Sequence, residues 1–188
     1  MTRPSYSITS NIQTTTAPGA ALGIALLLSA CSETNTKEAN APSADVKHPL
    51  VGQEAPEFNL KAEVGSKKVS PSDYSGKVVI VDFWATWCGP CRESFPAYER
   101  LVQDHDGVIV LGVSVDDEPE GIPDFVAETK VHFPIGWDKD QRVSGLYKPP
   151  AMPTSFMIDT NGIVRHVHTG YHAADEPVIA READALAE

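Results

Sequence analysis

The chain has 188 residues, of which 41% are hydrophobic and 22% charged, and its formal net charge at pH 7 is -11. This composition is typical of a soluble globular protein with one domain of ordinary size and a short appendage. The acidic balance excludes nucleic acid as a partner, because neutralising phosphates needs a basic face and none stands out. Three cysteines are too few for a scaffold held together by disulfides, so their positions carry the information.

Residues 1–30 predict a signal peptide. An apolar run of eleven residues, 20–30, follows a polar stretch whose single positive side chain is Arg3. As a helix the run spans about 16 Å, well short of the ~20 residues that cross a bilayer, which favours the hydrophobic segment of a signal peptide. It ends in Leu28-Ser29-Ala30-Cys31, which resembles the bacterial lipobox and implies lipidation of Cys31. The alternatives are a plain export signal with an incidental cysteine, or a start codon placed too early.

Residues 31–48 predict a flexible tether, and residues 49–188 predict the folded domain. The tether is rich in Ser, Thr, Asn, Ala and charge and shows no apolar period. Lipidation implies that the domain lies on the periplasmic side of a bacterial membrane, held there by its lipid anchor. Ser32 in place of an aspartate favours the outer membrane.

Strands and helices are expected to alternate along the folded domain. Residues 58–62 and 67–70 predict a short hairpin, and the continuous apolar run 78–84 predicts a central strand covered on both faces. Further strands are expected at 108–115, 155–158 and 163–168, and helices at 90–105, 121–129 and 174–187. Strand, helix and strand in succession predict a right-handed parallel crossover. The fold class is therefore α/β, with a central mixed sheet of about five strands flanked by helices.

Cys88 and Cys91 are expected where the central strand leads into the first helix. Unpaired backbone N–H groups and the helix dipole favour negative charge there, which stabilises the thiolate of Cys88. The spacing lets Cys91 reach back to Cys88, so Cys88 attacks a disulfide and Cys91 resolves the mixed disulfide that forms. A structural disulfide would close only a tiny loop, and a zinc site would need further ligands; both are the weaker alternatives.

Asp82 lies in the middle of the apolar run 78–84, six residues before Cys88. A carboxylate buried there would have a raised pKa and could take the proton of Cys91 and return it. The alternative is a carboxylate at the strand edge that faces water. Trp87 at the strand-to-helix turn is expected to be partly exposed beside the disulfide and to offer an apolar contact, whereas Trp84 is expected to be a core residue.

The segment 81–91, Val-Asp-Phe-Trp-Ala-Thr-Trp-Cys-Gly-Pro-Cys, closely resembles the active-site signature of thioredoxins. From about Val51 onward the chain looks like the extracytoplasmic TlpA/ResA-like branch of that fold. This resemblance implies an N-terminal hairpin, an insertion around the second crossover and a redox disulfide between Cys88 and Cys91. It also implies that Met152-Pro153 is a cis bond, and that Trp87, Gly89, Pro90, Met152 and Pro153 contact the substrate.

The function that the resemblance implies is thiol–disulfide exchange with protein substrates, without a bound cofactor or metal. Gly89-Pro90 is the dipeptide of the reducing members, which favours reduction. A reductase outside the cytoplasm must receive electrons, so a membrane thiol donor is implied as a partner. Cytochrome-maturation members often carry a glutamate three residues after the second cysteine; here Ser94 occupies that place and Glu93 is one residue off.

Two other functions stay open at this point. A peroxiredoxin-like peroxidase would need a threonine one residue further from the cysteine than Thr86 is from Cys88. A copper-handling protein would bind metal through Cys88 and Cys91. His166, His168 and His172 alternate near the last strand, but no cysteine or acid is clustered beside them in sequence, which favours a solvated strand face.

Overall fold

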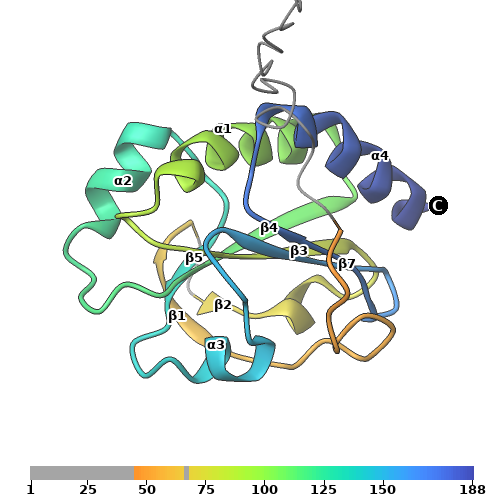
Figure 1. Cartoon of the computed structure of the whole chain (residues 1–188), viewed down its shortest axis with the longest axis horizontal. Helices are drawn as coiled ribbons and strands as arrows, with labels where there is room; N and C mark the ends of the chain where they lie inside the picture. The colour runs from red at the N-terminus through yellow and green to blue at the C-terminus, as the bar shows by residue number, and fades with distance from the viewer. Residues whose placement is uncertain (1–44, 66–67) are drawn as a thin grey trace, which may run out of the picture. The chain divides into compact units, whose positions relative to one another are not determined.

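The structure, a computed structural model, describes residues 45–65 and 68–188, all within the compact unit Asn35–Glu188. Their strands form one mixed sheet in the order β2-β1-β5-β4-β3-β6-β7 (Figure 1). The strands are β1 Leu60–Val64, β2 Lys68–Val69, β3 Val78–Trp84, β4 Val108–Ser114, β5 Ile135–Trp137, β6 Thr154–Ile158 and β7 Val164–Thr169. The predicted α/β class is confirmed, with seven strands in place of about five. The signal peptide and Cys31 lie outside the described residues.

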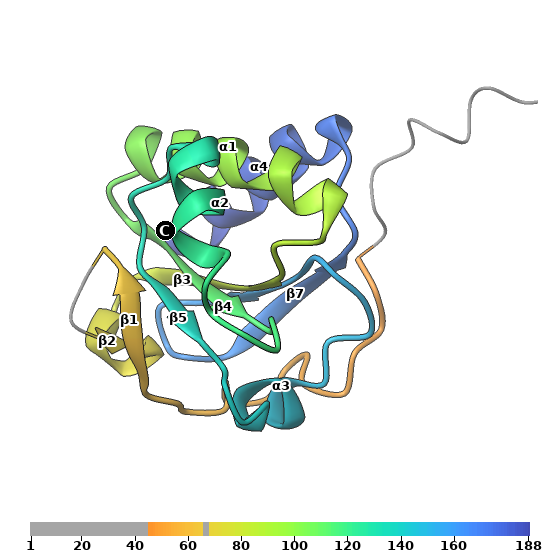
Figure 2. The same cartoon turned by 90° about the vertical axis from the view of Figure 1, so that its left-hand side faces the viewer.

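Helices cover both faces of the sheet (Figures 1 and 2). They are α1 Gly89–Asp104, α2 Ile122–Thr129 and α4 Glu176–Ala187 on one face, and α3 Arg142–Tyr147 on the opposite face. Because both faces are covered, every residue of β3 is buried. Alternate residues of β3 contribute to two separate cores: Ile80 and Trp84 face α1, whereas Val81 and Phe83 face α3.

β3 and β4 run parallel over seven residue pairs, with α1 as the connection between them. β4 and β5 are also parallel, so α2 is a second crossover. The predicted hairpin is present as β1 and β2, although β1 begins at Leu60 and not at residue 58. β5 and α3 were not predicted. They fill the stretch between the second crossover and β6, where the resemblance implied an insertion.

The segment 45–55, called the strap below, runs along the outer side of β7. Its backbone bonds to that strand at Val46 N–H to the carbonyl of Val167 (2.9 Å) and at Gly52 N–H to the carbonyl of Val164 (2.8 Å). Val164 N–H donates in return to the carbonyl of Gln53 (2.9 Å). Ordered contacts therefore begin within the range expected for the tether, four residues before the expected start of the domain at residue 49.

Candidate active site

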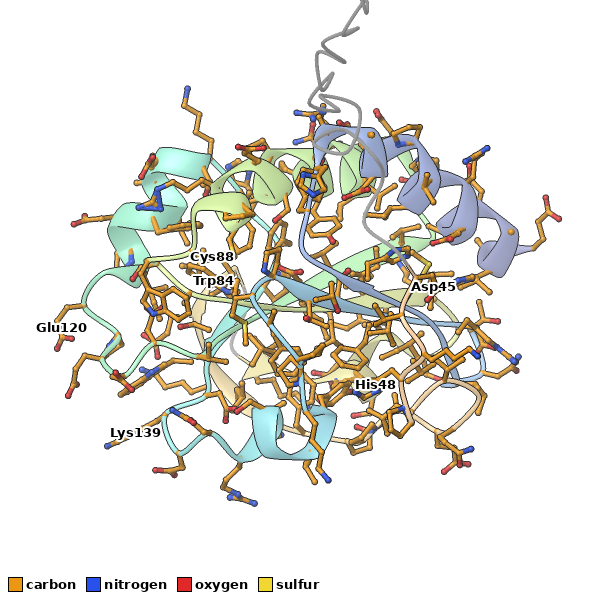
Figure 3. The ribbon with its side chains drawn as sticks, viewed as in Figure 1. Asp45, His48, Trp84, Cys88, Glu120 and Lys139 are labelled. Atoms are coloured by element: carbon orange, nitrogen blue, oxygen red, sulfur yellow. A yellow bond between two sulfur atoms is a disulfide. The ribbon has the colours of Figure 1, made fainter. Side chains whose placement is uncertain are left out.

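Cys88 and Cys91 lie where β3 leads into α1, and Figure 3 shows Cys88 close to Trp84 at this junction. A turn closed by Cys88 N–H to the carbonyl of Ala85 (3.1 Å) connects the two elements. Cys88 is the N-cap residue of α1 and Cys91 lies in its first turn. The two sulfurs form a disulfide, as the resemblance implied, and Cys88 is the more exposed of the two at 4% against 0%.

The start of α1 favours negative charge on the sulfur of Cys88. The backbone N–H of Cys91 donates to Cys88 Sγ at 3.3 Å, and Pro90 in the first turn has no N–H to leave unsatisfied. The positive end of the helix dipole acts in the same direction. A thiolate at Cys88 is therefore stabilised, which is the requirement for attack on a disulfide.

Asp82 is fully buried on the face of β3 that carries α1. Its exposed fraction is 0%, and neither carboxylate oxygen has a hydrogen-bond partner. Burial raises the pKa of Asp82 well above its usual value, because the charged form is deprived of solvent. The expectation of a buried carboxylate is thus met, and the alternative of a solvated one is not.

The surroundings of Asp82 are sparse in polar groups. Asp82 pairs in register with Gly112 of β4 on one side and with Ser155 of β6 on the other. Tyr98 of α1 is buried, and burial, followed by the charge of Asp82, raises its pKa well above the usual value. Tyr98 also shares the α1-side core with Cys91. The carboxyl group therefore lies in the layer between β3 and α1 that also contains Cys91.

The two tryptophans of the motif differ as predicted. Trp84 is fully buried, with ring centroids 4.7 Å from Phe95 and 4.5 Å from Phe125. Trp87 is 70% exposed, although it directly precedes Cys88. A large apolar side chain that is exposed beside the disulfide is available for contact with another molecule.

A groove of about 510 Å³ begins at Trp87 and extends to α3. Met152 forms part of its lining, and the Met152–Pro153 peptide bond is cis, as the resemblance implied. The remaining lining residues are Val115, Asp117, Gln141, Ser144, Gly145, Lys148 and Pro149. Two of the expected substrate contacts therefore border the same groove, whereas the wall contributed by α3 was not predicted from the sequence.

Thr86 and Asp116 form a contact that sequence analysis did not anticipate. Asp116 follows β4 and is 6% exposed. Its carboxylate accepts the backbone N–H of Thr86 at 3.0 and 3.1 Å and the Thr86 hydroxyl at 2.7 Å. The only available signal was an acid immediately after a buried strand, which does not reveal a partner 30 residues away.

The histidines near the last strand are not all solvated, which corrects the sequence-based interpretation. His168 is 3% exposed, and its Nε2 lies 2.6 Å from a carboxylate oxygen of Glu182 on α4. His166 Nδ1 lies 3.2 Å from Asp45 of the strap. These contacts join β7 to its neighbours. Among the described residues, no group of three or more His, Cys, Asp or Glu side chains could hold a metal ion.

Comparison with known proteins gives the same fold and chemistry. The model of the AhpC/TSA family matches residues 51–167. The thiol-disulfide oxidoreductase ResA of Oceanobacillus iheyensis is 38% identical over 125 residues, which is 64% of this chain and 65% of that protein, just under two thirds of its length. The thioredoxin-like protein YneN of Bacillus subtilis is 36% identical over 123 residues, which is 63% of this chain and 71% of that protein.

A solved structure shares the fold and much of the sequence. The thiol:disulfide interchange protein DsbE from Chlorobium tepidum is 35% identical, with a TM-score of 0.70 over 73% of this chain and 98% of that one. The Cys88–Cys91 disulfide at the start of α1 is the redox centre expected of such proteins. The chain therefore belongs to the AhpC/TSA family of thioredoxin-like proteins, as a thiol-disulfide oxidoreductase.

Proposed function

We propose that the chain reduces disulfides of protein substrates, with Cys88 as the attacking thiolate and Cys91 as the resolving thiol. The observation that carries the proposal is the position of the Cys88–Cys91 disulfide at the first turn of α1, next to the exposed Trp87 and its groove. A groove lined by the residue that directly precedes Cys88 suits an extended polypeptide, with Trp87 and Met152 as apolar contacts. Gly89, Pro90 and Pro153 complete the proposed substrate contacts.

The reaction proceeds in two exchanges. The Cys88 thiolate attacks one sulfur of the substrate disulfide, forms a mixed disulfide and releases the first substrate thiolate. Cys91 then loses its proton and attacks the Cys88 sulfur, which closes the Cys88–Cys91 disulfide and releases the second thiolate. Two electrons pass from the dithiol to the substrate. The protein must afterwards be reduced again, and we propose a membrane thiol protein as the donor.

Asp82 is proposed as the group that takes the proton of Cys91 in the second exchange. It lies on the face of β3 that α1 covers, and its carboxylate has no competing hydrogen-bond donor. Because burial raises the pKa of Asp82 well above its usual value, the carboxylate is a stronger base than an exposed one would be. Cys91, which is fully buried, has few other routes to lose its proton.

A trapping experiment tests the assignment of the two cysteines. In Cys91→Ser the first exchange is intact and the second is blocked, so the mixed disulfide with substrate should accumulate. Cys88→Ser is the matched control and should form no mixed disulfide. Mass spectrometry of the trapped species identifies the substrate, and accumulation in Cys88→Ser but not in Cys91→Ser would reverse the assignment.

Peroxide reduction is the second candidate, because the matched family bears the name AhpC/TSA. In this structure the Thr86 hydroxyl donates to Asp116 at 2.7 Å, and so its hydrogen is not available to a bound peroxide. We therefore expect hydrogen peroxide consumption no faster than that of Cys88→Ser. For the copper-handling alternative, titration of the reduced protein with Cu(I) should show no binding that blocks disulfide reduction.

The substrate range is proposed to extend beyond apocytochromes c. Ser94 is buried and its hydroxyl donates to the carbonyl of Cys91 (3.2 Å), while Glu93 is exposed. The glutamate that often marks cytochrome-maturation members is thus absent from the buried side of α1. Peptides with an oxidised Cys-x-x-Cys pair, with and without a following histidine, should be reduced at rates within about threefold of each other. A much larger preference for the histidine peptide would restrict the function to cytochrome maturation.

The location is proposed to be the periplasmic side of a bacterial membrane, with an anchor on Cys31 and the outer membrane favoured by Ser32. The support is the lipobox-like run before Cys31. None of the helices among the described residues is long and apolar enough to cross a membrane. Mass spectrometry of protein extracted from membranes should find a mature chain that starts at an acylated Cys31. An unmodified, freely released product would contradict the proposal.

A further inference from the structure

The turn that precedes Cys88 is bonded to one side chain from another segment, that of Asp116 after β4. The Asp116 carboxylate accepts from three donors: the N–H of Thr86, the hydroxyl of Thr86 and the hydroxyl of Ser114 at 2.8 Å. Its own backbone is fixed as well, because the indole N–H of Trp137 donates to the Asp116 carbonyl at 2.7 Å. Asp116 is therefore fixed by contacts that do not involve the turn.

Thr86 has further contacts. Its N–H and hydroxyl donate to Asp116, and its carbonyl accepts from Arg92 Nη1 at 3.1 Å. A Cβ on Gly121 would lie only 3.2 Å from the Thr86 methyl group, so this glycine permits close packing against the threonine. Thr86 is two residues before Cys88, and the turn between them has one closing bond, from Cys88 N–H to Ala85 (3.1 Å). The position of the sulfur thus depends on where Thr86 is held.

We propose that Asp116 is a positioning residue for the Cys88 nucleophile and that it acts through Thr86. This inference deepens the proposed function, because it names the group that fixes the attacking sulfur. Asp116 does not line the groove at Trp87. A misplacement of about 1 Å in a reacting group can cost ~10²-fold in rate, so a fixed turn is worth a dedicated contact.

The charge of Asp116 gives the proposal a second, distinct consequence. A buried negative charge near Cys88 opposes formation of its thiolate, and water screens it less than it screens the exposed carboxylates of Glu93 and Asp117. Arg92 at the Thr86 carbonyl and the N-terminus of α1 act in the opposite direction, while Asp82 beneath α1 adds to the effect of Asp116. Loss of the Asp116 charge should stabilise the reduced form and make the protein a weaker reductant.

Four variants of the full chain separate positioning from general stability. Thr86→Val removes the hydroxyl and Thr86→Ser keeps it. Asp116→Asn removes the charge, and Glu118→Gln, two residues away, removes an exposed charge that forms no hydrogen bond or ion pair with the described residues. The rate at which reduced Cys88 attacks a small disulfide should fall about tenfold in Thr86→Val, in keeping with one lost charge-assisted hydrogen bond. Thr86→Ser should restore it to within about twofold.

Two measurements test the effect of the Asp116 charge: the pH dependence of Cys88 alkylation, and the redox equilibrium of the protein with glutathione. In Asp116→Asn the midpoint of alkylation should move to lower pH, and the equilibrium should shift threefold to tenfold toward the dithiol, about 15–30 mV. Glu118→Gln should match the parent in both. If Asp116→Asn does not fold, the Thr86 variants decide the proposal alone.

Parent rates in Thr86→Val would overturn the positioning role. An alkylation midpoint in Asp116→Asn equal to that of Glu118→Gln would overturn the proposed effect of the Asp116 charge. These measurements need no protein substrate. A parent protein that fails to reduce protein disulfides would instead refute the proposed function, and the two failures are distinguishable.

Discussion

Two buried carboxylates flank the cysteine pair, and their surroundings are opposite. Asp82 in β3 is 0% exposed and neither of its oxygens has a partner, whereas Asp116 after β4 is 6% exposed and accepts from three donors. Burial alone therefore does not assign a role to an acid. A carboxylate surrounded by donors fixes its neighbours, while an unpartnered one gains stability when it takes up a proton.

The difference also separates the two steps of the exchange. Asp116 is bonded to the turn before Cys88, the residue proposed to attack, and Asp82 lies in the layer that contains Cys91, the residue proposed to resolve. We therefore expect Asp82 to act mainly on resolution by Cys91, and Asp116 mainly on attack by Cys88.

The largest effect is expected for Asp82→Asn, which keeps the shape of the side chain and removes the proton acceptor. Resolution of the mixed disulfide by Cys91 should slow by about 10²–10⁴-fold, the usual contribution of a general base. Stopped-flow measurement of mixed-disulfide decay is the check, with the initial attack by Cys88 as internal control. Equal slowing of both steps would mean that Asp82 and Asp116 do not have separate roles.

The next effect is the pH dependence of stability. Burial raises the pKa of Asp82 well above its usual value, so at a pH between the unfolded and the folded pKa the unfolded chain has lost a proton that the folded protein retains. The parent should lose stability as pH rises above the unfolded value, until the folded carboxyl also ionises. Asp82→Asn avoids this loss, so its advantage in denaturant melts should be larger at pH 8 than at pH 5. The same advantage at both pH values would show that Asp82 is solvated in solution.

A smaller effect is expected at the partnered carboxylate. Ser114 is fully buried and donates to Asp116 at 2.8 Å, so Ser114→Ala leaves one acceptor site without its donor. The cost should be about 1–3 kcal/mol in the free energy of unfolding, measured by denaturant melts. A variant as stable as the parent would show that Asp116 does not depend on the Ser114 hydroxyl.

The smallest effect is expected at an exposed carboxylate, which provides the reference for the two buried ones. Glu176 on α4 accepts two bonds of 2.9 Å from Arg100 on α1, and both side chains are partly exposed. Glu176→Gln should cost no more than ~1 kcal/mol, and the difference should shrink in high salt. Melts in low and high salt test this, and a loss as large as that of Ser114→Ala would show that this pair is shielded from solvent.

Most of the sheet and the centre of the site were predictable, because they depend on local signals. The buried run of β3, the cysteine pair after it and Asp82 within it are contiguous in the chain, and a strand covered on both faces has an unmistakable apolar pattern. Trp87 could be distinguished from Trp84 in the same way, by its place at the turn.

The remaining elements depend on contacts between distant segments. β5 has only three residues and includes Gly136, where a Cβ would lie 2.9 Å from the Cβ of Leu60. The strand exists because this glycine allows β1 to approach, which no local pattern reveals. α3 is six residues long and begins with the N–H groups of Val143 and Ser144 bonded to Asp138, which is 2% exposed. The contact between Asp116 and Thr86 was hidden for the same reason.

The strap has a consequence for how the molecule behaves among its own copies. An edge strand with free N–H and C=O groups is a template onto which a neighbouring chain can add a strand. Here β7 is the last strand of the sheet, and its outer backbone groups at Val164 and Val167 already bond to the strap of the same chain. The opposite edge, β2, is only two residues long. Strand-to-strand association is therefore disfavoured at both edges, and a protease cut within residues 45–55 would expose β7 and promote aggregation.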